Sequence, residues 1–449
     1  MEICELYSLF RDSSGVTTDS RTIKGGEVFF ALKGENFDGN EYALKALELG
    51  AGFAVVDAAS AVGSMSPLPK GIIPVRDTLE TLQALARHHR ENSFVDGKRL
   101  TVIGLTGTNG KTTTKELITA VLSSKYKVTA TKGNLNNDIG VPLSLLSIGP
   151  ETQLAVIEMG ASHPEDITSL VAVCEPDYGL ITNVGKAHLL GFGSFEGVKY
   201  AKGKLYDWLA FHGGTAFVNA DDPVLAGMAS DREGMDVISY GINYSGSIVL
   251  PSDANHPFVR MAVPENEGSE TLLAVESHLA GAYNASNIMA AIAVGKQFGV
   301  SLEEAIEAIE AYIPTNNRSQ MEKSSRNILI KDLYNANPTS MEAALDNLAL
   351  TEAESKVALL GEMRELGGES LSEHILILRK VRSMGLGLVC LVGEEFRKAL
   401  DAEPEGGEVK CFGTSDELAG WLGDHPVCGA TVLVKGSRGV QMEKVLKEL

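Results

Sequence analysis

The hydrophobic positions in the middle of the chain form short, continuously apolar runs separated by amphipathic stretches. RLTVIGLTG (99–107), LAVIEM (154–159) and YGLITNV (178–184) are the clearest of these runs. Strands buried on both faces of a parallel sheet have this pattern, and helical periodicity lies between them. Residues 99–314 are therefore predicted to form a parallel α/β domain. Within it, residues 236–276 are richer in turns and short β-like runs and predict a peripheral β-hairpin region.

A shorter α/β pattern precedes this domain. EVFFAL (27–32) and GFAVVD (52–57) predict strands, and EYALKALELG (41–50) predicts an amphipathic helix that ends at its glycine. A helical stretch at 79–92 is followed by the polar VDGK, which predicts a domain boundary. Residues 1–98 are therefore expected to form a small N-terminal α/β domain.

A further βαβ pattern fills residues 315–449. Its apolar runs are separated by helical stretches such as TSMEAALDNLAL (339–350) and HILILRKVRSMG (374–385). This alternation predicts a small Rossmann-like sheet. The predicted strands are NILIKD (327–332), KVALLG (356–361), GLVCLVG (387–393) and TVLVKG (431–436). The fold class is thus α/β with three domains, the central one built on a parallel sheet.

Composition agrees with this division and narrows the functional classes. A chain of 449 residues is too long for one core, since single cores stop growing near ~250–300 residues. The net charge of −20 opposes non-specific binding to nucleic acid or to an anionic membrane. No signal-like N-terminus and no apolar run of ~18 residues is present, so we expect a cytoplasmic protein without membrane insertion. Five scattered cysteines without a C-x-x-C pair indicate reduced thiols.

The apolar run at 99–107 leads into a glycine-rich turn and then a helix, within TVIGLTGTNGKTTTKELITAVL. Glycines let backbone N–H groups approach phosphates closely, and a helix N-terminus favours anions. Lys111 is expected to reach the β- and γ-phosphates, and the Thr112 hydroxyl to bind Mg²⁺. The turn alone could be structural, but the Lys-Thr pair after a buried strand favours a nucleotide triphosphate.

One departure from the strict P-loop pattern G-x-x-x-x-G-K-[ST] is present. Leu105 occupies the position of the first glycine, and Gly104 lies one residue earlier. The variant G-T-N-G-K-T-T remains a phosphate-binding pattern, although the loop alone does not specify the chemistry. The predicted nucleotide-binding residues of the loop are Gly107, Thr108, Asn109, Gly110, Lys111, Thr112 and Thr113.

Further motifs follow this loop in a fixed order along nearly the whole chain. They are GNLNNDIGVPLSLL (133–146), EMGASHPEDI (158–167), TNVGKAH (182–188), AKGKLY (201–206), GAYNASNIMAA (281–291) and DLYNANP (332–338). Together with GTNGKTT, they resemble the Mur ligases, which build the peptide of bacterial cell-wall precursors. The resemblance implies an ATP-dependent ligase that activates a carboxylate as an acyl phosphate.

The branch of the family is indicated by other segments. DSRTIKGGEVFFALKG (19–34) resembles the two later ligases, and no D-N-P-R motif of the diaminopimelate-adding branch is found. YNANP, LGEMRELG (360–367) and KGSRGVQMEKV (435–445) resemble the branch that adds D-alanyl-D-alanine to UDP-N-acetylmuramoyl-tripeptide. Three positions depart from the family pattern: Asn40 and Tyr283 replace a usual histidine, and Lys204 stands where glutamate is frequent.

The resemblance implies that four residues act in catalysis at the phosphates: Lys111, Glu158, His188 and Lys202. Lys111 and Mg²⁺ neutralise charge, and the implied metal residues are Thr112, Glu158 and His188, the last two near the carboxyl ends of predicted strands. Lys202 matches a lysine that is carbamylated in related ligases, although it could be a helix-surface lysine. Carbamylation would convert a cation into an anion that can act beside Mg²⁺.

Other residues are implied to contact the nucleotide and the precursor. Asn284 and Asn287, one helical turn apart, match nucleotide contacts, although asparagine is also a common helix cap. Arg318 and Asp332 match nucleotide contacts from the third domain, or could form only a structural ion pair. A hinge at 314–317 is expected to let the domains close.

The remaining implied contacts belong to the UDP-sugar-peptide substrate. In residues 1–98 they are Asp19, Ser20, Arg21 and Lys33, and in the central domain they are Asn134, Asn136 and Asn137. The three asparagines could instead form an ordinary polar loop. No residue is assigned to D-alanyl-D-alanine, and the third residue of the tripeptide, lysine or diaminopimelate, stays open.

Two alternative functions remain. Another Mur branch or a folylpolyglutamate-type ligase shares the central domain, and a non-catalytic nucleotide-binding module would share the loop. The intact set of Lys111, Thr112, Glu158 and His188 disfavours the second. The expected partners are the two substrates, with no nucleic acid, and a monomer is the expected state.

Overall fold

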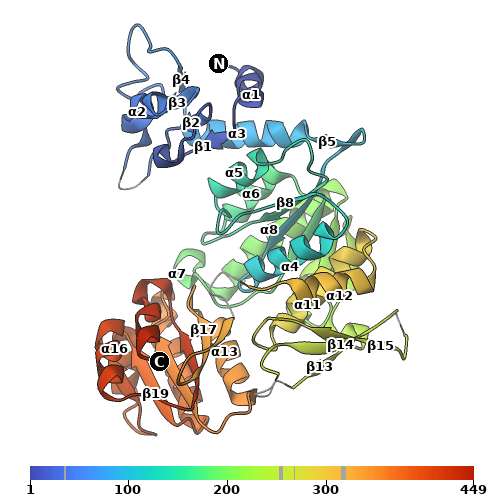
Figure 1. Ribbon diagram of the computed structural model, residues 1–449. Helices are drawn as coiled ribbons and strands as arrows, with labels where there is room; N and C mark the ends of the chain where they lie inside the picture. Colours follow the sequence, from blue (N-terminus) through green and yellow to red (C-terminus); the bar gives the residue numbers. More distant parts are fainter. Residues whose placement is uncertain (35–36, 252–255, 267, 315–319) are drawn as a thin grey trace.

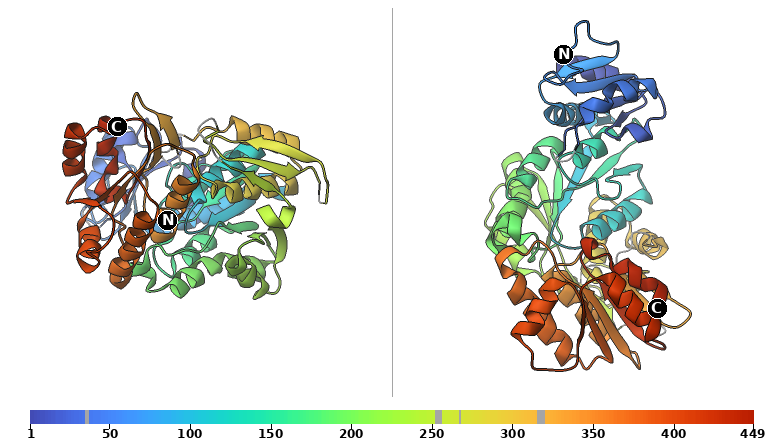
Figure 2. Two further views of the ribbon diagram at one scale, coloured as in Figure 1. Left: turned by 90° about the horizontal axis from the view of Figure 1, so that it is seen from below. Right: turned by 90° about the vertical axis from the view of Figure 1, so that its left-hand side faces the viewer.

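The computed structural model describes residues 1–34, 37–251, 256–266, 268–314 and 320–449. It contains three α/β units, with the N-terminal unit at one end, the central unit in the middle and the C-terminal unit at the other end (Figures 1 and 2). The fold class predicted from the sequence is confirmed. Across the described residues, no helix combines the length and the apolar character needed to cross a membrane.

The N-terminal unit is a four-stranded parallel sheet in the order β1-β2-β3-β4, with helices around it. Both predicted strands are present as β2 and β3, and the predicted helix at 41–50 is divided into a 3₁₀ turn and α2. The elements are α1 (Ile3–Arg11), β1 (Val16–Thr17), β2 (Val28–Phe30), α2 (Ala43–Glu48), β3 (Phe53–Asp57), β4 (Ile72–Val75) and α3 (Thr78–Glu91). A short hairpin, β5 (Phe94–Val95) and β6 (Lys98–Arg99), leads into the central unit.

The central unit is a six-stranded parallel sheet in the order β12-β11-β10-β7-β9-β8. Its strands are β7 (Thr101–Thr106), β8 (Val128–Ala130), β9 (Leu154–Glu158), β10 (Tyr178–Ile181), β11 (Thr215–Asn219) and β12 (Asp236–Tyr240). Its helices are α4 (Lys111–Ser123), α5 (Gly140–Leu146), α6 (Asp166–Cys174), α7 (Leu189–Phe192), α8 (Phe195–His212), α9 (Pro223–Ser230), α10 (Ile242–Ser245), α11 (Asn284–Gln297) and α12 (Leu302–Ala311). Alternate residues of the strands enter two separate cores, which explains their uninterrupted hydrophobicity.

The region predicted as a peripheral hairpin is divided in the structure. β12 is the edge strand of the parallel sheet, whereas β13 (Ile248–Leu250), β14 (Arg260–Pro264) and β15 (Leu272–Glu276) form a separate antiparallel sheet. Met261 and Val275 bury this small sheet in the core shared with α11 and α12. The hairpin prediction is therefore right for its later part and wrong for β12.

The C-terminal unit has a six-stranded sheet in the order β16-β17-β21-β18-β19-β20, parallel except for its edge strand β16. All four predicted strands are present; the short edge strands were not predicted because they carry little apolar signal. The strands are β16 (Gln320–Lys323), β17 (Ile328–Asp332), β18 (Lys356–Gly361), β19 (Leu388–Val392), β20 (Lys410–Phe412) and β21 (Thr431–Lys435). The helices are α13 (Pro338–Leu350), α14 (Ser370–Ser383), α15 (Glu394–Ala402) and α16 (Ser415–Asp424).

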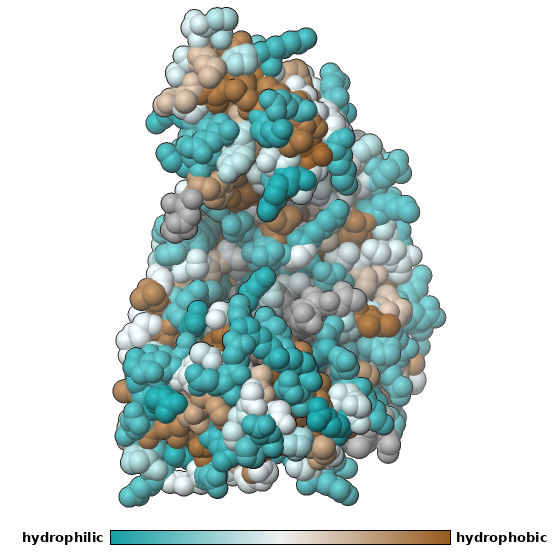
Figure 3. Space-filling model, turned by 60° about the vertical axis from the view of Figure 1, so that its left-hand side comes forward, coloured by the Kyte–Doolittle hydropathy of each residue, from teal (hydrophilic) through white to brown (hydrophobic). Residues whose placement is uncertain are grey.

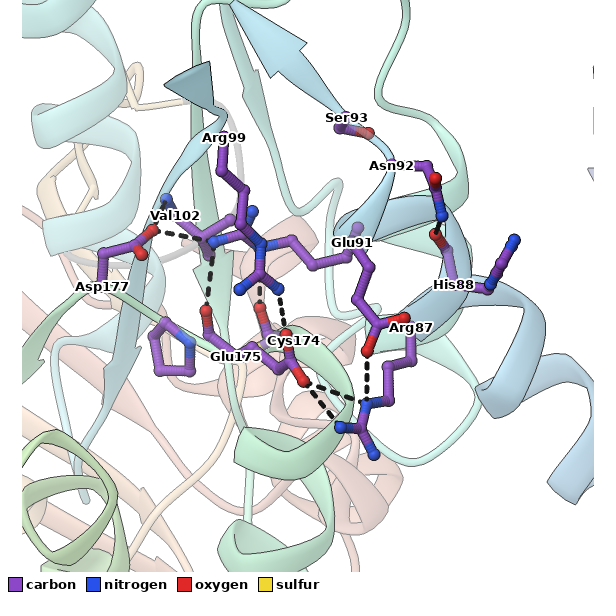
Figure 4. A network of polar contacts seen from close by, with 12 residues as sticks. Arg87, His88, Glu91, Asn92, Ser93, Arg99, Val102, Cys174, Glu175 and Asp177 are labelled. Carbon is purple, nitrogen blue, oxygen red and sulfur yellow. Dashed lines mark hydrogen bonds and ion pairs between the residues drawn. The ribbon is translucent and has the colours of Figure 1, made fainter. Parts of the chain in front are cut away.

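The helix α3 attaches the N-terminal unit to the central one. It lies between the N-terminal sheet and helices α5 and α6, and one hydrophobic core continues across it (Figure 1). At its end the fully buried Arg90 donates to the carbonyl oxygens of Cys174 and Glu175, both at 3.2 Å, and to Asp177 Oδ2 at 2.8 Å. Arg87 and Arg99 both pair with the Glu175 carboxylate (Figure 4). The proposed boundary between residues 98 and 99 lies within this contact, just before Arg99.

Replacement of Arg90 by Met should lower the midpoint of thermal unfolding. It leaves the two carbonyl oxygens and Asp177 without their buried donor, a loss of about 2 kcal/mol. The matched control is Arg87→Met, because the side chain of Arg87 is 52% exposed and an exposed ion pair contributes little. Equal midpoints for the Arg90 and Arg87 variants in a calorimetric scan would show that the buried contact does not hold the two units together.

Candidate active site

A cavity of about 910 Å³ lies at the carboxyl ends of the central strands. The loop before α4, the ends of β9 and β10 and the start of α11 form its central-unit side, and residues 332–340 with Lys435 form its C-terminal side. Open parallel sheets place their ligands at this edge. Hydrophilic side chains cover much of the molecular face drawn in Figure 3, interrupted by separate apolar groups.

The predicted phosphate loop joins β7 to α4. Gly107 has φ +151°, and a Cβ there would lie 1.9 Å from Thr182 Oγ1, so no other residue fits. The loop is tied to the segment after β10, because Asn109 N–H donates to Asn183 Oδ1 at 3.0 Å. Lys111 Nζ folds back to the carbonyl oxygens of the loop, at 2.7 Å from that of Gly107. Leu105, the departure from the strict pattern, is a fully buried residue of β7.

The two residues predicted to hold a metal at the start of α4 and the end of β9 lie side by side. Thr112 Oγ1 donates to the Glu158 carboxylate, 3.0 Å from Oε2 and 3.2 Å from Oε1. Asn136 Nδ2 donates to Glu158 Oε1 at 2.8 Å. Glu158 is only 1% exposed, which argues against the alternative of a solvated surface carboxylate. Mg²⁺ prefers oxygen ligands such as a hydroxyl, a carboxylate and the phosphates of a bound nucleotide, and the first two are present here.

His188 lines the same cavity but does not contact this pair. Its Nδ1 is hydrogen-bonded to the Glu365 carboxylate of the C-terminal unit. Burial lowers the pKa of His188, and the charge of Lys111 lowers it further, against the opposite effect of Glu365. Among the described residues, no group of three or more His, Cys, Asp or Glu side chains is arranged to hold a metal ion.

Lys202 lies on α8 and is 2% exposed. Its Nζ lies 5.8 Å from the centre of the Phe192 ring, and no hydrogen bond or ion pair links it to any residue within the described ranges. Burial lowers the pKa of Lys202 well below its usual value, and the charge of Lys111 adds to this. The surface-lysine alternative is therefore wrong. An amine held neutral is the form that can add carbon dioxide.

The predicted asparagines at the start of α11 both line the cavity and both have protein partners. Asn287 Oδ1 accepts from Thr114 Oγ1 at 3.0 Å, and its Nδ2 donates to Asn284 Oδ1 at 2.8 Å. Asn284 Nδ2 donates to the carbonyl oxygen of Ala280 at 2.7 Å. These bonds fasten α11 to α4, so the pair has a structural role beside any contact with nucleotide. Tyr283 also lines the cavity, at the N-terminus of α11.

The C-terminal unit contributes an ion pair between a buried lysine and a partly buried aspartate to the cavity. Asp332 accepts from Lys435 Nζ, which also donates to the carbonyl oxygen of Asn335 at 3.1 Å. Lys435 is 1% exposed. Arg318, predicted to act beside Asp332, and the predicted hinge residues 315–317 lie outside the described residues. Asn337 Nδ2 donates to Asn109 Oδ1 at 2.8 Å, which joins this unit directly to the phosphate loop.

The residues predicted for the UDP-sugar lie in the N-terminal unit, away from the lining of the cavity. Arg21 pairs with Asp19 at 2.7 Å, and this hydrogen bond lowers the pKa of Asp19 to about 2. Ser20 lies between them, and Lys33 is exposed. Asn40, a departure from the family pattern, is buried and bonds to both neighbouring carboxylates, Asp38 and Asp57. The side chain of Asn40 thus has a structural role within the N-terminal unit.

The loop of predicted precursor contacts is only partly at the cavity. Asn136 and Asn137 line it, whereas Asn134 does not. Asn137 Oδ1 accepts from the backbone N–H of Gly140, the first residue of α5, at 2.9 Å, which is a structural role. Lys204, the third departure, pairs with Asp207 at 3.2 Å on the surface of α8.

Sequence reasoning assigned no role to Asn183, Asn337, Lys435 and Glu365, which all contribute to the site. Each stands inside a quoted motif, TNVGKAH, YNANP, KGSRG or LGEMRELG, so the motif was the available signal. Their individual roles depend on contacts between segments far apart in the chain.

Three family models match the chain in order. They are the Mur ligase family, catalytic domain, at residues 12–90, the Mur ligase middle domain at 105–295, and the Mur ligase, glutamate ligase domain, at 317–438. Together they span most of the sequence.

Curated relatives and solved structures agree with the models. The UDP-N-acetylmuramoyl-tripeptide–D-alanyl-D-alanine ligase of Bacillus subtilis is 33% identical over 97% of this chain and 93% of the relative. That of Escherichia coli is 34% identical over 97% and 93%. A crystal structure of MurF from Acinetobacter baumannii superposes with TM-score 0.84 at 29% identity, covering 98% and 97%. MurF ligase from Thermotoga maritima in complex with ADP gives 0.83 at 26% identity, covering 97% of both chains.

Proposed function

The chain belongs to the Mur ligase family, and from that premise we propose that it joins D-alanyl-D-alanine to UDP-N-acetylmuramoyl-tripeptide in peptidoglycan precursor synthesis. It is an ATP-dependent ligase. The observation that carries the proposal is the match to relatives of this activity at 33–34% identity over 97% of the chain. The cavity between phosphate loop and C-terminal unit supports it, because both substrates and ATP must meet in one place.

The proposed reaction has two steps. An oxygen of the tripeptide carboxylate attacks the γ-phosphorus of ATP, the bond to ADP breaks, and an acyl phosphate forms. The amine of D-alanyl-D-alanine then attacks the acyl carbon, phosphate leaves, and the amine loses a proton. Lys111, on the loop beside the cavity, is placed to offset the charge that spreads over the phosphoryl oxygens.

Mg²⁺ is proposed as the second source of positive charge. When bound, it supplies electrostatic stabilisation to the phosphate oxygens. The Thr112 hydroxyl and the Glu158 carboxylate fit it, since they are adjacent and buried and Glu158 lines the cavity. His188, which lines the same cavity, is proposed to serve the same ion.

We also propose that Lys202 is carbamylated. An ammonium group so deeply buried without a hydrogen-bond acceptor is unfavourable, whereas a neutral amine can take up carbon dioxide as a carbamate. Cytoplasmic location and a monomeric state stay expectations.

The substrate assignment predicts a specific acceptor dependence. ADP release in the presence of ATP, Mg²⁺ and UDP-N-acetylmuramoyl-tripeptide should require D-alanyl-D-alanine and should not respond to single amino acids. Both the lysine and the diaminopimelate forms of the precursor belong in this assay, because they decide the third residue. Stimulation by one amino acid alone, or by folate with glutamate, would assign another branch, and tight ATP binding without turnover would indicate a non-catalytic module.

A further inference from the structure

The segment that follows β10 is held by the C-terminal unit at three points. Lys186 Nζ pairs with Glu373 at 2.6 Å, and the backbone N–H of Lys186 donates to Thr339 Oγ1 at 3.2 Å. The backbone N–H of Leu190 donates to the carbonyl oxygen of Glu365 at 3.0 Å. His188 lies between these contacts, so its surroundings are built by two units of the chain.

Both residues of the side-chain contact between His188 and Glu365 have a left-handed backbone conformation. His188 has φ +51° and Glu365 has φ +64°. This left-handed conformation is unfavourable for residues other than glycine by roughly 1–2 kcal/mol. Such residues are concentrated at functional sites, where the surrounding structure maintains the strain. Two of them therefore face each other across the boundary between the units.

The loop that carries Glu365 is itself fixed. The backbone N–H of Met363 donates to Nε2 of the fully buried His374 at 3.0 Å, and that of Arg364 donates to Ser437 Oγ at 3.0 Å. The side chains flanking Glu365 on either side of the loop, Met363 and Leu366, are 1% and 2% exposed. Glu365 thus reaches His188 from a rigid support, although its own side chain is exposed.

The chemistry of the contact specifies the state of the imidazole. A carboxylate only accepts hydrogen bonds, so Nδ1 of His188 must carry the proton that it donates to Glu365. In the neutral ring the other nitrogen, Nε2, then keeps its lone pair, and this residue lines the cavity. A histidine that binds a metal is commonly held in this way by a carboxylate behind it.

We propose that Glu365 is a positioning residue, which fixes the tautomer and orientation of His188 and makes the metal side of the site depend on contact with the C-terminal unit. The proposal rests on the proposed function, because His188 is assigned to the metal there. It predicts that the orientation of the His188 ring is less well fixed when the C-terminal unit is not in contact with the central unit.

A purely mechanical role is the competing explanation. Glu365 could only fasten α7 to the C-terminal unit, as the Lys186–Glu373 pair does. Lys186→Ala is therefore the control, because it removes a neighbouring cross-unit contact without touching the imidazole. Glu365→Gln keeps an acceptor for Nδ1–H and removes the charge, and Glu365→Ala removes both.

The first readout does not depend on turnover. The chain has nine histidines, so ¹⁵N-histidine spectra of the full-length protein without nucleotide can be assigned with the help of His188→Asn. Wild type, Lys186→Ala and Glu365→Gln should show His188 protonated at Nδ1, whereas Glu365→Ala should show a mixture of tautomers. A wild-type His188 protonated at Nε2, or an unchanged tautomer in Glu365→Ala, would overturn the proposal.

The second readout is ADP release as a function of Mg²⁺ concentration. Glu365→Ala should need about 10- to 100-fold more Mg²⁺ or lose kcat by that factor, with the KM for the UDP-precursor unchanged, and Glu365→Gln should lose less. Lys186→Ala should not shift the Mg²⁺ dependence. Equal shifts in the Lys186 and Glu365 variants would establish the mechanical role. If His188→Asn itself left the Mg²⁺ dependence unchanged, the proposed metal role would fail instead.

Discussion

Replacement of Lys111 by Met is expected to reduce ADP release by about 10³-fold or more, the scale reached when one cation is removed from a transferring phosphoryl group. Methionine retains most of the length of the side chain and loses the ammonium group. In the wild type Lys111 Nζ lies on the loop, 2.7 Å from the carbonyl oxygen of Gly107, so its charge is held beside the expected phosphate site. Steady-state ADP release at saturating substrates measures the effect.

Lys127→Met is the matched control for this change. Lys127 is an exposed lysine of the same unit, after α4, and its replacement should leave ADP release within about twofold, as expected for a surface substitution. Circular dichroism should show both variants folded. A Lys111 variant that keeps more than about a tenth of the wild-type rate would contradict the assignment of this loop to the transferred phosphate.

The sequence predicted most of the architecture because its signals are local. Each strand of the two large sheets that is buried on both faces, such as β7 or β18, is an uninterrupted apolar run. The errors lie at sheet edges. β12, with exposed residues at 236 and 237, resembles the turn-rich segment that follows it, and only its pairing with β11 gives it a place in the central sheet.

The site was predicted unevenly for a similar reason. Thr112 and Glu158 could be paired in advance, because a loop after β7 and the end of the adjacent strand β9 must meet at one edge of the sheet. The partners of His188 and Asp332 could not, since Glu365 and Lys435 are 177 and 103 residues away in sequence. Their contacts depend on how the C-terminal unit is placed on the central one.

Contacts between distant segments also decide the role of residues that depart from the family pattern, and these contacts cannot be predicted from the sequence. Asn40 could not be interpreted from sequence, because its role is to bond Asp38 and Asp57, the latter at the end of β3. The replacement of a usual histidine there is thus compatible with an intact fold. Lys202 illustrates the opposite case: its lysine-rich surroundings suggested an exposed helix, and only the packing of α8 reveals that this side chain is buried.

Replacement of Lys202 by Ala is expected to reduce ADP release by about 100-fold or more, because the variant cannot form the anionic carbamate in a buried site. A short-chain carboxylic acid added to Lys202→Ala should restore part of the rate, since its carboxylate can enter the space that the side chain leaves. In wild-type protein supplied with ¹³C-bicarbonate, a carbamate carbon signal should appear and should be missing in the variant.

The control for this experiment is Lys204→Ala, two residues further along the same helix. Lys204 lies against Tyr200, with Nζ 4.1 Å from the ring centre, and pairs with Asp207, so its loss changes only the surface of α8. It should leave both the rate and the carbamate signal unchanged. Full activity of Lys202→Ala without added acid would exclude a catalytic carbamate. A large loss without rescue and without a wild-type carbon signal would instead assign Lys202 a role as an unmodified amine, which burial and the nearby Lys111 hold neutral by lowering its pKa.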